Sequence, residues 1–137
     1  QLHDGLRRYI GDLNRVYRDL PALHEVDFQQ AGFRWIQADD TQNSIFAYIR
    51  LAENPDDFVV VLANFTPTPR NSYRIGVPEA GFYTELINSD AKIYGGSNIG
   101  NVGGLYSEPV PMHGFEHSLC VAAPPLSMLI LKPTKPA

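Results

Sequence analysis

Two pairs of adjacent carboxylates are the residues best suited to acid–base chemistry in this sequence. Asp39 with Asp40, and Asp56 with Asp57, have the residue types of the two acids in a glycoside hydrolase. That chemistry requires two carboxyl groups that face each other across the scissile bond, whereas neighbours in one turn point apart. Both pairs lie in polar stretches where aspartate side chains bond to the local backbone. We therefore predict that they shape turns and are not catalytic.

Two histidines and the single cysteine are the remaining candidates for metal or nucleophile chemistry. His113 and His117 are four residues apart, which is the spacing of a zinc-binding pair on a helix. Their stretch, MHGFEH, contains Gly114, follows Pro111 and has no third ligand nearby. Cys120 falls within an alternating strand pattern, without a recognisable acid or base partner. We expect no metal site, no cofactor and no catalytic residue in this chain.

Residues 90–104, with the sequence DAKIYGGSNIGNVGG, are unusually rich in glycine. The glycine spacing fits neither the dinucleotide fingerprint nor the P-loop, and the residues that follow are typical of a strand rather than a helix. Glycine supplies backbone with positive φ at little steric cost, and asparagine tolerates it. The pattern therefore predicts a structural loop and excludes a nucleotide site.

Aromatic side chains could hold sugar rings, because the C–H groups of a pyranose pack against π-faces. Trp35 is the best candidate, since Arg34 and Gln37 beside it indicate a strand near the surface. For any other single aromatic residue a place in the core is the more common role. The other aromatic residues that we weighed are Tyr48, Tyr73, Phe82, Tyr83, Tyr94 and Tyr106.

The element that precedes these residues is an amphipathic helix. Apolar residues recur at intervals of three and four between Leu2 and Leu20, and Pro21 ends the pattern. A stripe of this length would naturally cover part of another domain. Because the sequence also starts in mid-helix, we expect a fragment of a larger protein. The expected organisation is a helix at 1–22, a linker at 23–32 and a second unit at 33–137.

After the helix the pattern changes to short strands that are separated by turn-forming residues. The run Phe58 to Phe65 is apolar and β-branched, which is typical of a central strand buried on both faces. We predict a mainly β fold: an antiparallel, Greek-key-like sandwich of about eight strands preceded by one helix. The other expected strands are Phe33–Ile36, Ser44–Leu51, Tyr73–Val77, Phe82–Asn88, Leu105–Met112, Ser118–Ala122 and Ser127–Leu131.

Composition excludes several classes of partner. The 137 residues include 11 basic and 15 acidic side chains, a formal charge of −4, so the basic patch of a nucleic-acid-binding protein is missing. No stretch approaches the roughly 18 apolar residues that a membrane span needs. With one cysteine there is no disulfide framework, and no signal peptide is recognisable. We expect a cytoplasmic protein that binds neither nucleic acid nor membrane.

Several sequence blocks, in the same order, resemble the C-terminal end of bacterial 1,4-α-glucan (glycogen) branching enzymes. The resemblance covers nearly all of the chain. Its most specific parts are NFTP with PR and YR (residues 64–74), Glu85 with NSD (88–90), YGGSN (94–98), HSL (117–119) and PP (124–125).

The resemblance implies a multidomain enzyme of the α-amylase superfamily, with a central (β/α)8 barrel and a C-terminal antiparallel β-sandwich. Residues 2–20 would be the last barrel helix. The parent would transfer α-1,4-glucan chains to form α-1,6 branches, using an aspartate nucleophile, a glutamate acid/base and a second aspartate. These three residues would lie upstream of Gln1. The chain itself would then support the barrel and hold glucan, with the barrel and α-glucan as its partners.

Trp35, Tyr83 and Tyr94 are the candidate glucan contacts. Trp35 keeps the Gly-Phe-x-Trp context of relatives, whereas Tyr83 stands where relatives commonly have tryptophan. Two alternative functions remain at this point: a stand-alone carbohydrate-binding module, and the terminal domain of another α-glucan enzyme, such as a debranching or trehalose-forming hydrolase. The sequence leaves open whether the glycine-rich loop touches glucan or the barrel.

Overall fold

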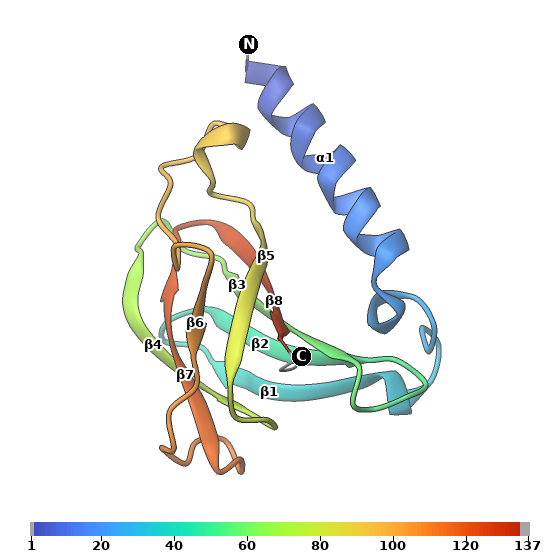
Figure 1. The fold of residues 1–137 in the computed structure, drawn as a ribbon. Helices are drawn as coiled ribbons and strands as arrows, with labels where there is room; N and C mark the ends of the chain where they lie inside the picture. Colours follow the sequence, from blue (N-terminus) through green and yellow to red (C-terminus); the bar gives the residue numbers. More distant parts are fainter. Residues whose placement is uncertain (1, 135–137) are drawn as a thin grey trace.

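The computed structural model describes residues 2–134 and contains one long helix followed by eight strands (Figure 1). The structure thereby confirms the predicted mainly β fold. The elements are α1 (Leu2–Asp19), the 3₁₀ turns η1 (Pro21–Leu23) and η2 (Gln30–Gly32), β1 (Phe33–Asp40), β2 (Ile45–Leu51), β3 (Phe58–Asn64), β4 (Arg70–Val77), β5 (Phe82–Asn88), the 3₁₀ turn η3 (Lys92–Tyr94), β6 (Gly104–Tyr106), β7 (His117–Ala123) and β8 (Ser127–Pro133).

The strands form two antiparallel sheets. Six strands pair in the order β1-β2-β3-β8-β5-β6, and the other two, β4 and β7, form a separate ribbon. Strand β3 lies between β2 and β8 near the middle of the larger sheet, and all its residues except Ala63 are buried. The prediction of a central strand buried on both faces is therefore confirmed.

One face of the large sheet packs against the β4–β7 ribbon to form the main core. Alternating residues of β2 and β3 point inward from the large sheet, as the two-residue period of a strand requires. They meet the inward side chains of the ribbon. Fully or almost fully buried members include Ile45, Ala47, Ile49, Val60, Leu62, Ile75, Val77, Leu119, Val121, Leu129 and Leu131.

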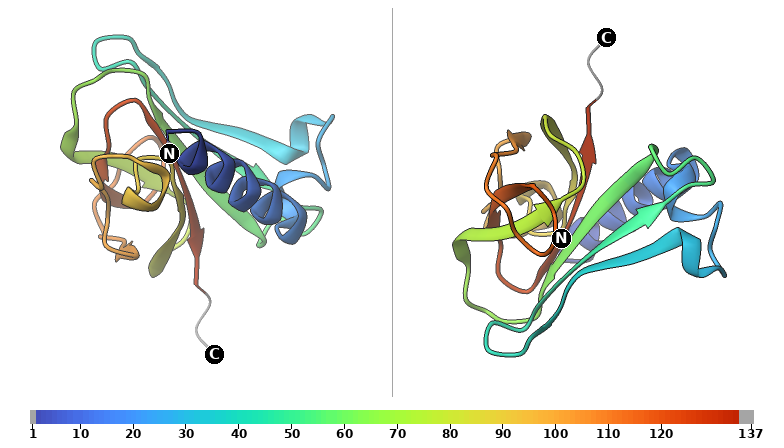
Figure 2. Two further views of the ribbon diagram at one scale, coloured as in Figure 1. Left: turned by 90° about the horizontal axis from the view of Figure 1, so that it is seen from above. Right: turned by 90° about the horizontal axis from the view of Figure 1, so that it is seen from below.

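The opposite face of the large sheet is covered in part by α1, which runs alongside it (Figures 1 and 2). Tyr9, Leu13 and Val16 pack against a second cluster of buried residues that includes Val59 and Val61 of β3. We expected the helical stripe to cover another domain, but half of it covers the sheet. The other half is open to solvent, at Leu6, Ile10 and Tyr17.

The expected strand from Leu105 to Met112 is much shorter than predicted, because β6 ends at Tyr106. Proline lacks the N–H that a strand ladder needs, and two prolines, Pro109 and Pro111, follow. Glu108 nevertheless forms an isolated antiparallel bridge with Ser118 of β7. The chain here runs along the edge of the ribbon without forming a regular strand.

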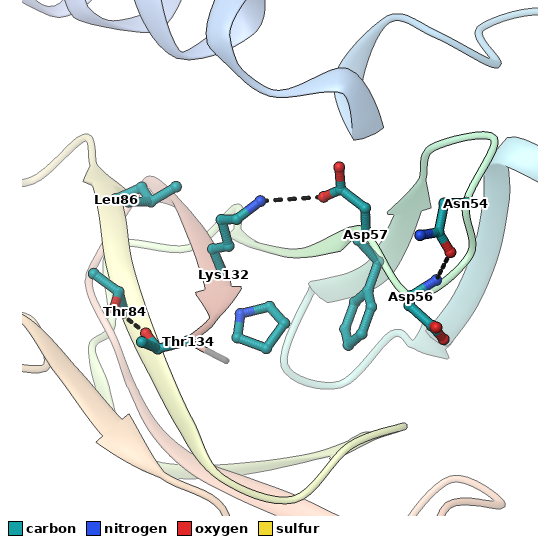
Figure 3. Close-up of a pocket in the computed structure, with 9 residues that line it drawn as sticks. Asn54, Asp56, Asp57, Thr84, Leu86, Lys132 and Thr134 are labelled. Carbon is teal, nitrogen blue, oxygen red and sulfur yellow. Dashed lines mark hydrogen bonds and ion pairs between the residues drawn. The ribbon is translucent and has the colours of Figure 1, made fainter. Parts of the chain in front are cut away.

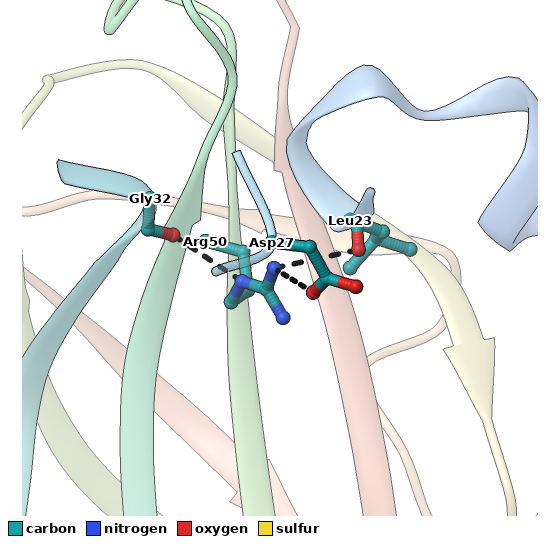
Figure 4. Close-up of polar contacts among 4 residues, drawn as sticks. All are labelled: Leu23, Asp27, Gly32 and Arg50. Atoms are coloured by element: carbon teal, nitrogen blue, oxygen red, sulfur yellow. Dashed lines mark hydrogen bonds and ion pairs between the residues drawn. The ribbon is translucent and has the colours of Figure 1, made fainter. Parts of the chain in front are cut away.

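Arg50 of β2 fixes the connection between α1 and β1 (Figure 4). Its Nε donates to the carbonyl oxygen of Gly32 at 3.2 Å, and its Nη2 donates to that of Leu23 at 3.4 Å. The same Nη2 forms an ion pair of 3.0 Å with Asp27. One side chain thus holds three points of the 23–32 segment against the sheet. This segment in turn sets the position of the C-terminal end of α1.

Two glycines of α1 differ sharply in their surroundings, so the same substitution at each gives a matched test of helix docking. A Cβ at Gly5 would lie 2.2 Å from the carbonyl oxygen of Tyr94, whereas Gly11 has nothing within 4 Å. Gly5→Ala should lower the free energy of unfolding by about 1–3 kcal/mol, the usual cost of overpacking. Gly11→Ala should raise it by up to about 1 kcal/mol through helix propensity alone.

The free energy of unfolding of both variants is measured by urea denaturation, followed by circular dichroism. Opposite signs for the two substitutions would show that α1 is docked through its contact at Gly5. Equal stabilisation by both alanines would contradict the close approach between α1 and η3.

Candidate functional site

The part of the large sheet that α1 leaves uncovered carries a group of aromatic side chains on β1, β2 and the residue after β3. We call this group the aromatic strip. Its best exposed members are Phe65 and Trp35, at 63% and 52%. The strip consists of Phe33, Trp35, Phe46, Tyr48 and Phe65.

Strand register brings these rings together. Trp35 of β1 is paired with Tyr48 of β2, and the centroids of their rings lie 5.9 Å apart. Phe46 points to the same face two residues earlier, 6.2 Å from Trp35 and 5.5 Å from Phe65. Phe33 lies 5.1 Å from Trp35. Each contact falls in the range of offset or edge-to-face aromatic pairs, so the rings support one another as a row.

A small hollow of about 260 Å³ lies at the Phe46–Phe65 end of the aromatic strip. Its other walls come from the β1–β2 turn and include Asp40, Thr41 and Ser44. Apolar ring faces beside hydroxyl and carboxylate groups form the mixture that sugar rings require, since a pyranose has an apolar C–H face and a polar rim. The strip therefore has the chemical composition of a carbohydrate-binding surface.

Asp40 is the polar centre of the β1–β2 turn. It accepts hydrogen bonds from the backbone N–H and side-chain amide of Asn43, at 3.1 and 3.0 Å, and from the Tyr73 hydroxyl. The bond from Tyr73, followed by those from Asn43, lowers the pKa of the Asp40 carboxyl below its ordinary value. Burial and the neighbouring Asp40 raise the pKa of Tyr73. Asp40, the last residue of β1, thus stabilises the turn that follows it, as predicted for this residue.

The second carboxylate pair borders a larger hollow, of about 560 Å³, where β8 ends between β3 and β5 (Figure 3). Asp57 forms an ion pair of 3.1 Å with Lys132, and the backbone N–H of Asp56 donates to Asn54. The hydroxyls of Thr84 and Thr134 are bonded to each other at 2.8 Å. Most polar groups around this hollow are thus paired with one another by hydrogen bonds or ion pairs. Asp56 and Asp57 lie in the turn between β2 and β3.

Tyr83 offers no face to a ligand, although its sequence context made it a candidate. Its side chain is fully buried in the main core, 6.4 Å from the ring of Phe58. Its hydroxyl donates to the carbonyl oxygen of Glu79 at 2.8 Å. Burial raises the pKa of this phenol. Alternation along β5 places Tyr83 inward, so its ring is part of the core and not of a sugar platform.

Tyr94, the third candidate, joins the glycine-rich loop to α1. Its ring packs edge-on against Tyr9 at 5.3 Å, and its hydroxyl donates to Asp12 at 2.6 Å. Burial and, secondarily, the Asp12 carboxylate raise the pKa of Tyr94 to about 12. The side chain is half-buried in this contact. These contacts make Tyr94 part of the surface against which α1 packs.

The glycine-rich loop is held by side chains from its own ends. Asp90 accepts bonds from the backbone N–H groups of Ser97 and Ile99, at 3.0 and 3.1 Å. A Cβ at Gly96 would lie 2.2 Å from the Asp90 carbonyl oxygen, although Gly96 does not have positive φ. Positive φ occurs instead at Gly95, Gly103 and Gly104. Glycine is needed at 96 for close packing of the loop against itself.

The side chain of Asn101 in this loop makes the hydrogen bonds that a neighbouring strand would otherwise make at the edge of β7. Its side chain both accepts from and donates to the backbone of Ala122, at 2.8 and 3.1 Å. Glu85 of β5 accepts from the backbone and side chain of Asn101, at 3.0 and 2.8 Å. The loop therefore connects both sheets and closes an edge of the ribbon. This role supports the structural interpretation of the loop.

No group of three or more His, Cys, Asp or Glu side chains that could hold a metal ion occurs within residues 2–134. In the same range no helix has the length and apolarity that crossing a membrane requires. His113 accepts a hydrogen bond from the backbone of Gly76, and Cys120 lies in the middle of β7.

The sequence correctly indicates that Trp35 lies near the surface, but it does not show that the members of the aromatic strip lie together. The strand pattern accounts for Phe33, Phe46 and Phe65 only as parts of strands. A usable signal was the alternation in β2, where Phe46 and Tyr48 stand between the aliphatic residues that face the core. Knowledge of the β1–β2 register was also needed to group them.

The two-sheet, all-β fold is that of a known class of domain. Residues 35–134 match the alpha amylase C-terminal all-beta domain. The chain belongs to this family.

Among individual proteins, the chain is similar to bacterial enzymes named 1,4-alpha-glucan branching enzyme GlgB. It is 58% identical to that of Burkholderia thailandensis over 126 residues, which are 92% of the chain and 15% of the relative. It is 52% identical over 131 residues to that of Aromatoleum aromaticum, covering 96% of the chain and 20% of the relative. It is 52% identical over 130 residues to that of Thermosynechococcus vestitus, and these residues are 95% of the chain and 17% of the relative. The chain thus spans about a sixth of the relatives' length.

Asn101→Ala tests the structural role of the glycine-rich loop. The substitution leaves the N–H and C=O of Ala122 without their partner and removes one bond to Glu85. Unsatisfied groups of this kind cost about 1–3 kcal/mol, so the free energy of unfolding should fall by that amount. Asn14→Ala, on the exposed face of α1, is the control and should leave stability unchanged or slightly higher. Equal effects of the two alanines in urea denaturation would contradict the edge-closing role.

Proposed function

We propose that the chain is the non-catalytic C-terminal part of a cytoplasmic 1,4-α-glucan branching enzyme. Within that enzyme it supports the catalytic barrel and holds α-glucan. The observation that carries this proposal is identity above 50% to enzymes of that name over nearly the whole chain. The parent's transfer of α-1,4 chains to form α-1,6 branches would be carried out by carboxylates outside this chain.

The proposed support of the barrel rests on the half of α1 that the sheet does not cover. Leu6 and Ile10 are 58% and 46% exposed, and Tyr17 lies on the same helix at 46%. Ile93 of η3, whose turn contacts α1, is also exposed. Exposed apolar groups of this kind are typical of a protein contact. We propose that residues 1–22 form the last barrel helix, 23–32 the linker and 33–137 the sandwich.

The proposed glucan contact is the aromatic strip with Trp35 at its centre. Trp35 offers a half-exposed indole, and Phe46 and Phe65 extend the apolar surface toward the polar β1–β2 turn. One stacked ring contributes only about 1 kcal/mol, so a row of rings suits a polymer that binds at several glucose units at once. Tyr83 is not part of this proposal because it is buried, and Tyr94 contributes chiefly by docking α1.

Purified chain mixed with amylose tests the absence of catalysis. We expect no fall in the iodine-staining absorbance of amylose and no new α-1,6 linkages, with a full-length relative as the positive control. Formation of branches by the chain alone would contradict the proposal directly.

Trp35→Ala tests the glucan contact. Loss of one stacked indole should weaken binding of maltoheptaose about fivefold, equivalent to ~1 kcal/mol, as measured by isothermal titration calorimetry. Stability should change little because Trp35 is half-exposed.

The matched control for this substitution is Tyr106→Ala, which removes an even more exposed aromatic ring from β6, at the far edge of the large sheet from β1. It should leave maltoheptaose affinity unchanged. Unchanged affinity in a folded Trp35→Ala protein would remove the aromatic strip from the proposed function.

A further inference from the structure

The free edge of β4 is covered by a tight turn from a distant part of the chain. Among the described strands, β4 pairs with β7 alone, so its second edge has no strand partner. At that edge the backbone N–H of Gly76 donates to Nδ1 of His113 at 3.1 Å. An imidazole thus takes the place of a neighbouring strand at this position.

The turn that carries His113 is closed at both ends. Met112 and Phe115 exchange two backbone hydrogen bonds, at 3.0 and 2.9 Å. Between them His113 and Gly114 both have positive φ, at 52° and 81°, as in the hairpin turn of type I′. Positive φ is uncommon for a residue other than glycine, and histidine is one of the few side chains that adopt it more readily. The bond from Gly76 to the His113 side chain helps to hold the turn in this conformation.

The turn also completes the main core. Phe115 is 9% exposed and belongs to the buried cluster, with the guanidinium of Arg34 lying 4.5 Å from the centre of its ring. A Cβ at Gly76 would lie 2.1 Å from the carbonyl oxygen of Met112. The backbone of the turn approaches the backbone of β4 so closely here that a side chain at position 76 has no room. Loss of the His113 bond would therefore expose the edge of β4 and loosen the packing of Phe115 in the core.

We propose that His113 is a pH-sensitive latch, in which the neutral imidazole holds the turn 112–115 over β4 and protonation releases it. The Gly76 N–H needs a lone pair on Nδ1 as its acceptor. An imidazolium carries hydrogen on both ring nitrogens and can only donate. The bond and a protonated His113 are therefore mutually exclusive.

The surroundings of His113 set the direction of its titration. Burial lowers the pKa of His113 below its ordinary value near 6.5, and the carboxylates of Asp39 and Asp40 on β1 oppose this effect without cancelling it. The remaining charged or titratable side chains on the elements around the turn are Arg34 of β1, Arg70, Tyr73 and Arg74 of β4, Glu108 and Glu116 beside the turn, and His117 and Cys120 of β7.

The sign of the pH dependence follows from this direction. The unfolded chain binds a proton at His113 more readily than the folded chain does. The contribution of the latch to stability is therefore complete above pH 6.5 and is lost as the pH falls from there through the folded-state pKa. The Asp40 carboxyl, whose pKa is lowered from 3.8, titrates in a separate and more acidic window.

Nuclear magnetic resonance of the full chain tests the latch. The amide proton of Gly76 should shift with the same midpoint as the His113 ring, and that midpoint should lie below 6.5. Protection of the Gly76 amide from hydrogen exchange should fall about tenfold between pH 7.5 and pH 5. Independent titration of the two groups, or a His113 midpoint at or above 6.5, would overturn the proposal.

Two substitutions at His113 separate the titrating latch from a merely structural side chain. In His113→Asn, Oδ1 is attached where Nδ1 was and accepts the same bond, and asparagine tolerates positive φ. Its Gly76 amide should stay protected at both pH values. His113→Ala should lose that protection at both. His117→Asn is the control and should retain the acid-induced loss. Persistence of that loss in His113→Asn would refute the latch.

Discussion

The two apolar faces of the six-stranded sheet are the constraint on which the rest of the structure depends. β3 carries buried residues on both faces, so neither face can be left to water. The β4–β7 ribbon covers one face, and α1 covers part of the other. The position of the ribbon and of α1 on these two faces determines which parts of the sheet are buried and which are exposed. The aromatic strip lies in a part of the large sheet that neither of them covers completely.

Attachment of α1 depends on polar contacts at both of its ends. Arg50 binds the segment after the helix, while Tyr94 and the close approach at Gly5 hold the helix to η3. The glycine-rich loop that carries η3 is in turn connected to both sheets through Asn101. The loop is therefore part of the framework that sets where α1 lies.

The sequence was sufficient to predict the number of strands, the approximate bounds of most of them and the buried centre at Phe58–Phe65, because two-residue alternation and turn residues are local signals. It also correctly predicted that Asp40 stabilises a turn, although Asp39 and Asp40 themselves end β1 and the Asp57 carboxylate binds the distant Lys132 instead of the local backbone. The burial of Tyr83 and the grouping of Phe46 and Phe65 with Trp35 depend on register and on which face of each strand is inward. Arg50 and His113 carry no local signal at all, since their bonds join segments 18 or more residues apart. Long-range pairing of this kind cannot be inferred from spacing along one chain.

The central claim is that the uncovered part of the sheet is the glucan-binding surface of this domain. The most direct measurement is a titration of isotope-labelled chain with maltoheptaose, followed by nuclear magnetic resonance of the backbone amides and the Trp35 indole N–H. The account requires the largest shifts along β1 and β2, at the indole and around Phe46 and Phe65. Shifts centred instead on the hollow at Lys132 and Thr134, or an unchanged indole at saturating sugar, would contradict it.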